Sequence, residues 1–324
     1  MDKVNLSQIQ FGACAWGYEM LAPGDVKGFR RVAEKVSKLP FPKRAEVIEI
    51  LDFLDAESHE ANLRTASEKK KIAKDLGLRV IVTGFNPNML GPKDPSPHLT
   101  SEDYAERRDA ITRMKRGIIH ASLVAEDKEG ILNGPSYMRH EYFPKEGLRG
   151  DEHKLLVDIL RQDISPFAKK QNNTRVALEP LNHDEGYLMM PGNESLKIVC
   201  AVGKNIGINL DTTHYAQNAE GSMPSSLRNA MHKGKGFTLH LSENDRRQWG
   251  NGDNGARTLE IIQSFNYNIP ANQVLPVTLE NFCPDLYGAL RIHRPSKMKP
   301  GQIVTNGADY IRRVIELAEA EDFD

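Results

Sequence analysis

The sequence has few cysteines and no arrangement that would link them. Three cysteines stand among 324 residues, an odd number, widely spaced and without a C-x-x-C pair: Cys14, Cys200 and Cys283. This usage excludes a disulfide framework and a thiolate zinc site, and it is typical of a reducing compartment. Because no stretch approaches 18 apolar residues and the first residues form no leader-like apolar run, we expect no membrane span and a cytoplasmic protein.

An excess of charge of either sign is also missing. With 43 basic and 44 acidic residues the formal net charge is -1, which leaves no overall field to hold a polyanion. Nucleic acid and anionic membranes are therefore not expected as partners, and a small molecule is. The composition, 39% hydrophobic and 27% charged, is that of an ordinary globular protein with a large core, and we find no internal repeat or low-complexity tract.

Short segments rich in β-branched residues alternate with longer amphipathic segments along the whole chain. This alternation predicts strands that are each followed by a helix. Eight strands are expected, at residues 8–16, 46–53, 79–85, 131–134, 175–179, 207–211, 237–241 and 274–280. Helices are expected at residues 25–39, 60–76, 101–126, 151–170, 194–202, 224–232, 258–265 and 308–321.

Eight βα units predict an α/β fold, a (β/α)8 TIM barrel formed by residues 1–324 as a single domain. An open, doubly wound sheet is the alternative. The Pro-rich residues 86–100 and the Pro-, Lys- and Arg-rich residues 284–303 follow strands, so in a barrel they would be extended loops on the catalytic face.

Four consecutive predicted strands end in residue types that bind metals. The segments VALE, INLD, FTLH and VTLE end in Glu179, Asp211, His240 and Glu280. Because the carboxyl ends of parallel strands meet on one face of a barrel, we expect the four side chains to converge. A polar residue at one strand end is usually a cap or turn former, but four in succession favour a metal site.

Three carboxylates in a partly dry pocket need a compensating cation. Ligation by carboxylate oxygens and one histidine, without cysteine, favours one divalent ion, Mn2+ first, with Mg2+ or Co2+ as alternatives.

Three motifs around these residues resemble a known family. They are EPLNHDE at residues 179–185, DTTH at residues 211–214, and HLSENDR at residues 240–246 with the following GNG at 250–252. In order and spacing they resemble the ketose 3-epimerases, the D-tagatose and D-psicose (allulose) 3-epimerase family of the xylose-isomerase-like barrels. The resemblance is good over residues 175–280 and only general before them.

The resemblance implies roles for individual residues. Glu179 and Glu280 would bind the metal and exchange the substrate proton from opposite faces, while Asp211 and His240 would complete the coordination. Proton abstraction next to a ketose carbonyl would pass through an enediolate, and return of the proton to the opposite face would invert the carbon.

Further residues are candidates for contact with the sugar. Glu185, His214 and Arg246 resemble family residues that hydrogen-bond substrate oxygens. Outside the motifs, Trp16 on the first strand could wall the pocket, and Tyr137 and His140, in the segment after the fourth strand, are candidate contacts with the sugar. The family also implies a homo-oligomer, a dimer or a tetramer.

Three other readings of the sequence remain open. The same metal and glutamates could drive elimination, as a lyase or dehydratase acting on a keto-glycoside, an inosose or a sugar acid. A non-catalytic sugar-binding barrel is a second reading, although both glutamates are present. A barrel endonuclease would need more histidine ligands and a basic surface.

Overall fold

The eight strands close into a parallel barrel. The computed structural model describes residues 6–19, 24–52, 59–84, 99–125, 129–134, 148–181, 189, 191–217, 223–243, 248–266, 269, 273–281, 299 and 301–320. The strands are β1 (Ile9–Cys14), β2 (Val47–Leu51), β3 (Arg79–Thr83), β4 (Ile131–Gly134), β5 (Arg175–Leu178), β6 (Ile206–Asp211), β7 (Gly236–Leu241) and β8 (Leu275–Leu279).

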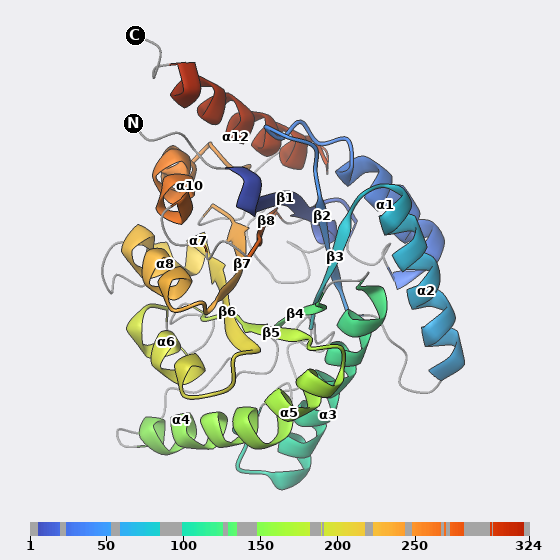
Figure 1. Ribbon diagram of the computed structural model, residues 1–324, viewed down its shortest axis with the longest axis vertical. Helices are drawn as coiled ribbons and strands as arrows, with labels where there is room; N and C mark the ends of the chain where they lie inside the picture. Colours follow the sequence, from blue (N-terminus) through green and yellow to red (C-terminus); the bar gives the residue numbers. More distant parts are fainter. Residues whose placement is uncertain are drawn as a thin grey trace.

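Each strand pairs with the next one in the sequence, and β1 also pairs with β8, where Ile9 lies opposite Leu275 (Figure 1). This closing pair confirms the predicted (β/α)8 barrel and excludes the open sheet.

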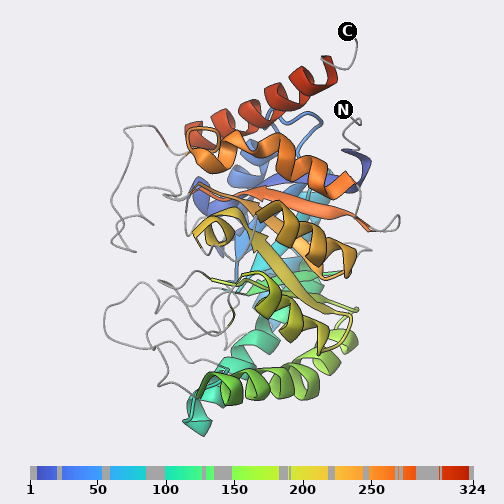
Figure 2. The ribbon, with the colours of Figure 1, turned by 90° about the vertical axis from the view of Figure 1, so that its left-hand side faces the viewer.

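Helices surround the strands. They are α1 (Val26–Val36), α2 (His59–Asp75), α3 (Tyr104–Val124), α4 (Leu148–Ile159), α5 (Ser165–Lys170), α6 (Asn193–Cys200), α7 (Thr212–Gln217), α8 (Met223–His232), α9 (Asp253–Ala256), α10 (Thr258–Asn266) and α12 (Gln302–Ala320). In the side view of Figure 2 the strands lie crosswise between the red α12 above them and the green helices below them. None of the described helices combines the length and the apolar character that a membrane-spanning segment needs.

Two of the predicted helices differ in detail. The helix expected at residues 151–170 contains a π-helical turn, Leu160–Ile164, before α5. Pro166 stands in the first turn of α5, and because proline has no N–H to donate, the regular ladder is interrupted there. The last helix begins at Gln302, six residues before the expected start at 308. The short helices α7 and α9 were not predicted.

Alternate residues of each strand face the helices or the inside of the barrel. On β2, Ile48 and Ile50 belong to the large apolar cluster shared with the helices, whereas Val47 packs with Ile81 and Ile131 in a separate small cluster. This small cluster is an apolar floor inside the barrel.

Beyond the floor the inside of the barrel is polar. Two residues further along β2, β3 and β4, the same face presents Glu49, Thr83 and Asn133, all buried. Hydrogen bonds link these residues to buried side chains of four other strands. We call the set the polar layer: Cys14, Glu49, Thr83, Asn133, Asn209, Thr238 and Thr278. It lies directly beneath the strand ends that carry the predicted metal ligands.

Candidate metal centre

The structure brings the four strand-end residues together. Asp211 is the last residue of β6, His240 lies one residue before the end of β7, and Glu179 and Glu280 directly follow β5 and β8. One ligand atom from each lies within 4.8 Å of those of the others, and all four residues are buried.

The distances within the cluster suit a divalent cation. Nδ1 of His240 lies 3.5 Å from Oε2 of Glu280, 3.7 Å from Oε1 of Glu179 and 3.8 Å from Oδ2 of Asp211. Ligand atoms about 2.1 Å from an ion are separated by about 3.0 to 3.4 Å at octahedral to tetrahedral angles. The three histidine–carboxylate distances therefore exceed those around a bound ion by only a few tenths of an ångström, and the donors are three carboxylates and one imidazole.

Asp211 is fixed so that one of its oxygens faces the cluster. Its Oδ1 accepts hydrogen bonds from the Thr213 backbone N–H at 2.7 Å and from the Ser242 hydroxyl at 2.6 Å. These bonds turn Oδ2 toward His240.

The charges of the cluster interact strongly. Burial raises the pKa of Glu179, but hydrogen bonds from His214 and His240 outweigh burial and hold this pKa well below its ordinary value. Burial lowers the pKa of His240, while the negative charges of Glu49 and Glu280 raise it well above its ordinary value. One imidazolium can offset only one of three carboxylates, so the remaining negative charge favours a divalent cation.

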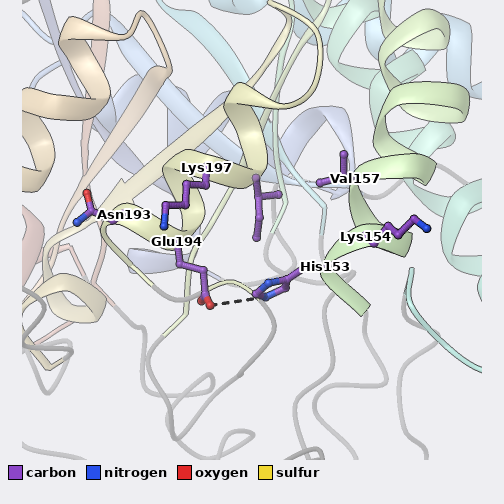
Figure 3. Close-up of a pocket in the computed structure, with 7 residues that line it drawn as sticks. His153, Lys154, Val157, Asn193, Glu194 and Lys197 are labelled. Atoms are coloured by element: carbon purple, nitrogen blue, oxygen red, sulfur yellow. Dashed lines mark ion pairs between the residues drawn. The ribbon is translucent and has the colours of Figure 1, made fainter. Parts of the chain in front are cut away.

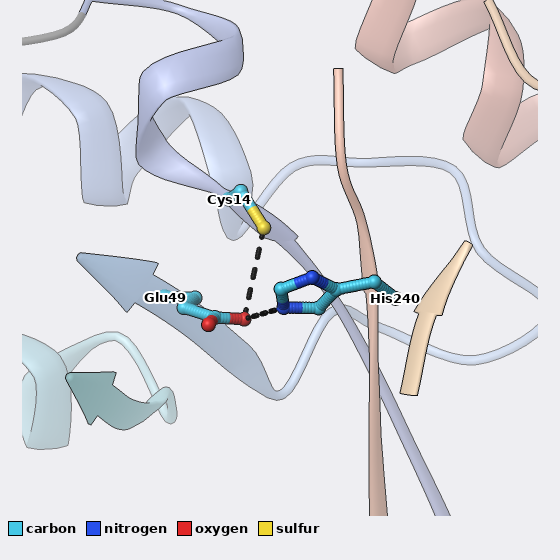
Figure 4. A group of neighbouring side chains, drawn as sticks. All are labelled: Cys14, Glu49 and His240. Carbon is cyan, nitrogen blue, oxygen red and sulfur yellow. Dashed lines mark hydrogen bonds and ion pairs between the residues drawn. The ribbon is translucent and has the colours of Figure 1, made fainter. Parts of the chain in front are cut away.

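A buried carboxylate that the sequence reasoning missed contacts the other side of the histidine ring. Oε2 of Glu49 lies 2.9 Å from Nε2 of His240, and the Cys14 thiol lies 3.6 Å from the same oxygen (Figure 4). Burial raises the pKa of Glu49, but the charge on His240 and hydrogen bonds from His240, Thr83 and Asn133 hold this pKa below its ordinary value. A lone glutamate on the inward face of an apolar strand, EVIEIL, is the signal that could have revealed it.

A second missed carboxylate orders the glycine-rich loop after β7. Oε1 of Glu243 accepts hydrogen bonds from the backbone N–H groups of Gly250, Gly252 and Gly255 at 2.9 to 3.2 Å, and Oε2 accepts from that of Asn254 at 3.2 Å. A Cβ atom at Gly255 would lie 2.6 Å from Glu243 Oε1, so the close approach requires glycine.

Two of the predicted sugar contacts border the cluster. Nε2 of His214 lies 3.5 Å from Oε1 of Glu179. The Trp16 ring stands edge-on to the His240 ring, with the ring centroids 6.4 Å apart, and both residues are buried. The other predicted contacts lie outside the described residues: Glu185, Arg246, Tyr137 and His140.

A surface pocket lies away from this chemistry. The described side chains that line it come from the outer helices α4 and α6 and include His153, Lys154, Glu194 and Lys197 (Figure 3). His153 and Glu194 form a 3.7 Å ion pair across it. The pocket contains none of the four converging strand-end residues.

Comparisons with known proteins agree with the fold. The structure is similar to that of L-ribulose 3-epimerase, with a TM-score of 0.73 and 16% identity over 97% of each chain. It is similar to D-psicose 3-epimerase from Clostridium cellulolyticum H10, with a TM-score of 0.71 and 19% identity over 94% of this chain and 99% of that chain. For 3-keto-D-glucoside 4-epimerase from E. coli the TM-score is 0.65, at 16% identity over 94% and 99% of the two chains.

No curated protein sequence matches the chain closely enough to count as a relative. The family model of the xylose isomerase-like TIM barrel, in contrast, matches residues 45–314, most of the chain. The chain belongs to the xylose isomerase-like TIM barrel family.

Proposed function

We propose that the protein is a divalent-metal-dependent sugar epimerase or isomerase of the ketose 3-epimerase type. The observation that carries the proposal is the convergence of Glu179, Asp211, His240 and Glu280 at the carboxyl ends of four consecutive barrel strands. When bound, the ion would polarise the carbonyl of a ketose and offset negative charge that develops on its oxygen.

The two glutamates are the proposed acid and base. Glu179 follows β5 and Glu280 follows β8, with β6 and β7 between them, so the two carboxylates enter the cluster from different sides. One carboxylate would remove the proton next to the carbonyl, leaving an enediolate, and the other would return a proton to the opposite face. The carbon then inverts, which is epimerisation.

The neighbours of the cluster support a sugar as the small-molecule substrate. The Trp16 ring supplies apolar surface beside His240, and His214 can hydrogen-bond a hydroxyl beside Glu179. Glu185, Arg246, Tyr137 and His140 remain proposed contacts. Carboxylate-rich ligation favours Mn2+, with Mg2+ or Co2+ as alternatives. The homodimer or homotetramer stays a prediction, as does the cytoplasmic location.

A keto-glycoside is a second candidate substrate. The observation that favours it is the similar structure of 3-keto-D-glucoside 4-epimerase from E. coli. Epimerisation and elimination share the first step, because both begin with removal of the proton next to the carbonyl.

Metal-dependent deuterium exchange measures this shared step. In D2O with Mn2+, we expect the wild type to incorporate solvent deuterium into a ketohexose, a ketopentose or a 3-keto-glucoside. The variants Glu179→Gln and Glu280→Gln should each lose at least about 100-fold in rate, the scale of acid–base catalysis. Glu260→Gln, on the exposed face of α10, is the matched control and should keep the wild-type rate.

The same assay separates the alternatives. Exchange that needs no metal, or that survives both glutamate substitutions, contradicts the proposal. Sugar binding without exchange on any of the three substrates supports a non-catalytic barrel instead.

A further inference from the structure

The two nitrogens of His240 share one neighbour, the Asn209 amide nitrogen at 3.2 and 3.4 Å, but face different charged partners. Nδ1 points toward Glu179, Asp211 and Glu280, whereas Nε2 lies 2.9 Å from Oε2 of Glu49 (Figure 4). Glu49 comes from β2, 191 residues away in the sequence and outside the set of four converging residues.

We propose that Glu49 is a positioning residue that decides which nitrogen of His240 is available to a cation. The inference rests on the metal proposed above. An ionised carboxylate only accepts hydrogen bonds, so Nε2 must carry the proton that it shares with Glu49. In a ring that holds a cation, Nδ1 is the nitrogen without a proton, on the side of the other three ligands, and the ring cannot rotate without breaking the bond to Glu49.

Glu49 itself is held in place by donors on both of its oxygens. Oε1 accepts from the Thr83 hydroxyl and, at 2.6 Å, from the Asn133 amide, while Oε2 accepts from the Thr278 hydroxyl at 2.9 Å. The carboxylate in turn orients the Asn133 amide, because it accepts only the NH2 side; the Asn133 oxygen then lies 2.8 Å from the Thr238 hydroxyl, whose one proton it shares with the Asn209 oxygen at 2.7 Å. The polar layer therefore fixes the carboxylate, and the carboxylate fixes the imidazole.

This arrangement makes glutamine an informative substitute. A Glu49→Gln side chain that keeps both donors to the Oε1 position, the Thr83 hydroxyl and the Asn133 amide, places its NH2 at the Oε2 position, facing His240. Two N–H groups cannot bond to each other, so Nε2 would have to become an acceptor and the ring proton would move to Nδ1. That proton would occupy the direction of the cation.

A second ion held by Cys14, Glu49 and His240 is the competing interpretation, because the ligand atoms of these three residues also lie within 4.8 Å of one another. The hydrogen bonds from Thr83, Asn133 and Thr278 already engage both oxygens of Glu49. We therefore assign the carboxylate to positioning rather than to ligation.

The test is Mn2+ binding to the metal-stripped full-length protein, followed by the electron paramagnetic resonance signal of free Mn2+. We expect one ion per wild-type chain and an affinity lower by about 10- to 100-fold or more in Glu49→Gln, the usual effect of removing a carboxylate behind a ligating histidine. Asp52→Asn is the matched control. Asp52 follows the same strand and forms a 2.8 Å contact with the buried His120, away from the cluster, so wild-type affinity is expected.

Each outcome is decisive. A wild-type protein that binds no Mn2+ contradicts the proposed function itself. A wild type that binds one ion while Glu49→Gln loses less than about tenfold in affinity overturns the positioning role. Two ions per wild-type chain, one of them lost in Cys14→Ala, would favour the second-ion interpretation and also overturn it.

A spectroscopic readout covers the case in which Glu49→Gln does not fold. In wild-type protein carrying 15N-labelled histidine and saturated with Mg2+, which is diamagnetic, the imidazole 15N shifts and N–H couplings report which nitrogen carries the proton. The His240 signal is assigned by its absence in His240→Gln. We expect the proton on Nε2, and a proton on Nδ1 contradicts the inference.

Discussion

Replacement of Glu243 by glutamine should loosen the glycine-rich loop without disturbing the barrel. One oxygen of the carboxylate accepts three backbone N–H groups and the other accepts one. A glutamine would keep its oxygen on the side with three donors and place its NH2 against the Asn254 N–H. One hydrogen bond to a charged group is lost, worth about 1.5 to 3 kcal/mol, and the other three become bonds to a neutral acceptor.

The three weakened bonds share one oxygen and together add about 0.5 to 1 kcal/mol to this loss, so the free energy of local opening should fall by about 2 to 4 kcal/mol. Since about 1.4 kcal/mol corresponds to a factor of ten, amide hydrogen exchange in residues 250–255 should become about 30- to 1000-fold faster. Mass spectrometry of a peptide that covers these residues measures the change. A peptide that covers β1 is the internal reference, and Glu260→Gln, a substitution on the exposed face of α10, is the control variant. Exchange within threefold of wild type at residues 250–255 would refute the reasoning.

Three further predictions concern other parts of the molecule. A Cβ atom at Gly12 would overlap the Val47 carbonyl oxygen and lie 2.6 Å from its carbon. Gly12→Ala should therefore lower the free energy of unfolding in urea by about 3 kcal/mol or more. Gly150→Ala is the control: it lies on a helix with nothing within 4 Å of the added Cβ, and it should raise this free energy by up to about 1 kcal/mol. Burial lowers the pKa of Lys69 to about 8, against opposing effects of Asp25 and Asp52. The unfolded chain therefore binds more protons above this pH, and the stability of wild type relative to Lys69→Met should rise between about pH 8 and 10.5, by up to about 3 kcal/mol; a difference that stays flat with pH contradicts this. Mn2+ at about 100 times its dissociation constant should add about 2.7 kcal/mol and raise Tm by about 4 °C, and an unchanged Tm in millimolar Mn2+ would count against a metal site.

The barrel could be predicted because each strand carries its own signal. Eight short β-branched segments, each followed by an amphipathic one, are a local pattern, and the observed strands lie within the predicted ranges or extend one residue beyond them. The predicted start of the last helix was wrong because Asn306 and Gly307 resemble a turn in the sequence. In the structure Gly307 is helical, and a Cβ there would lie 3.3 Å from the Trp249 Cβ and 3.4 Å from Leu279. Glycine serves close packing at this position.

The sequence predicted the four strand-end ligands of the candidate site but not Glu49 or Glu243, for a related reason. Ligand types at four strand ends share one position relative to the strand, so the pattern indicates their convergence. Glu49 stands in the middle of its strand, and the bonds that explain it come from residues 34 to 229 positions away. The partners of Glu243 are backbone N–H groups, which every non-proline residue carries. Neither carboxylate could be understood before the fold had placed its partners.

The polar layer also bears on how the chain is made. Glu49 is synthesised early, yet two of its hydrogen-bond donors, His240 and Thr278, belong to the last two strands. A nascent chain that has folded only its first four strands would bury the Glu49 carboxylate without the hydrogen bonds from His240 and Thr278, which is unfavourable. Completion of the barrel interior therefore has to wait until residue 278 has left the ribosome, and fragments cut between the two halves should associate with each other rather than fold alone.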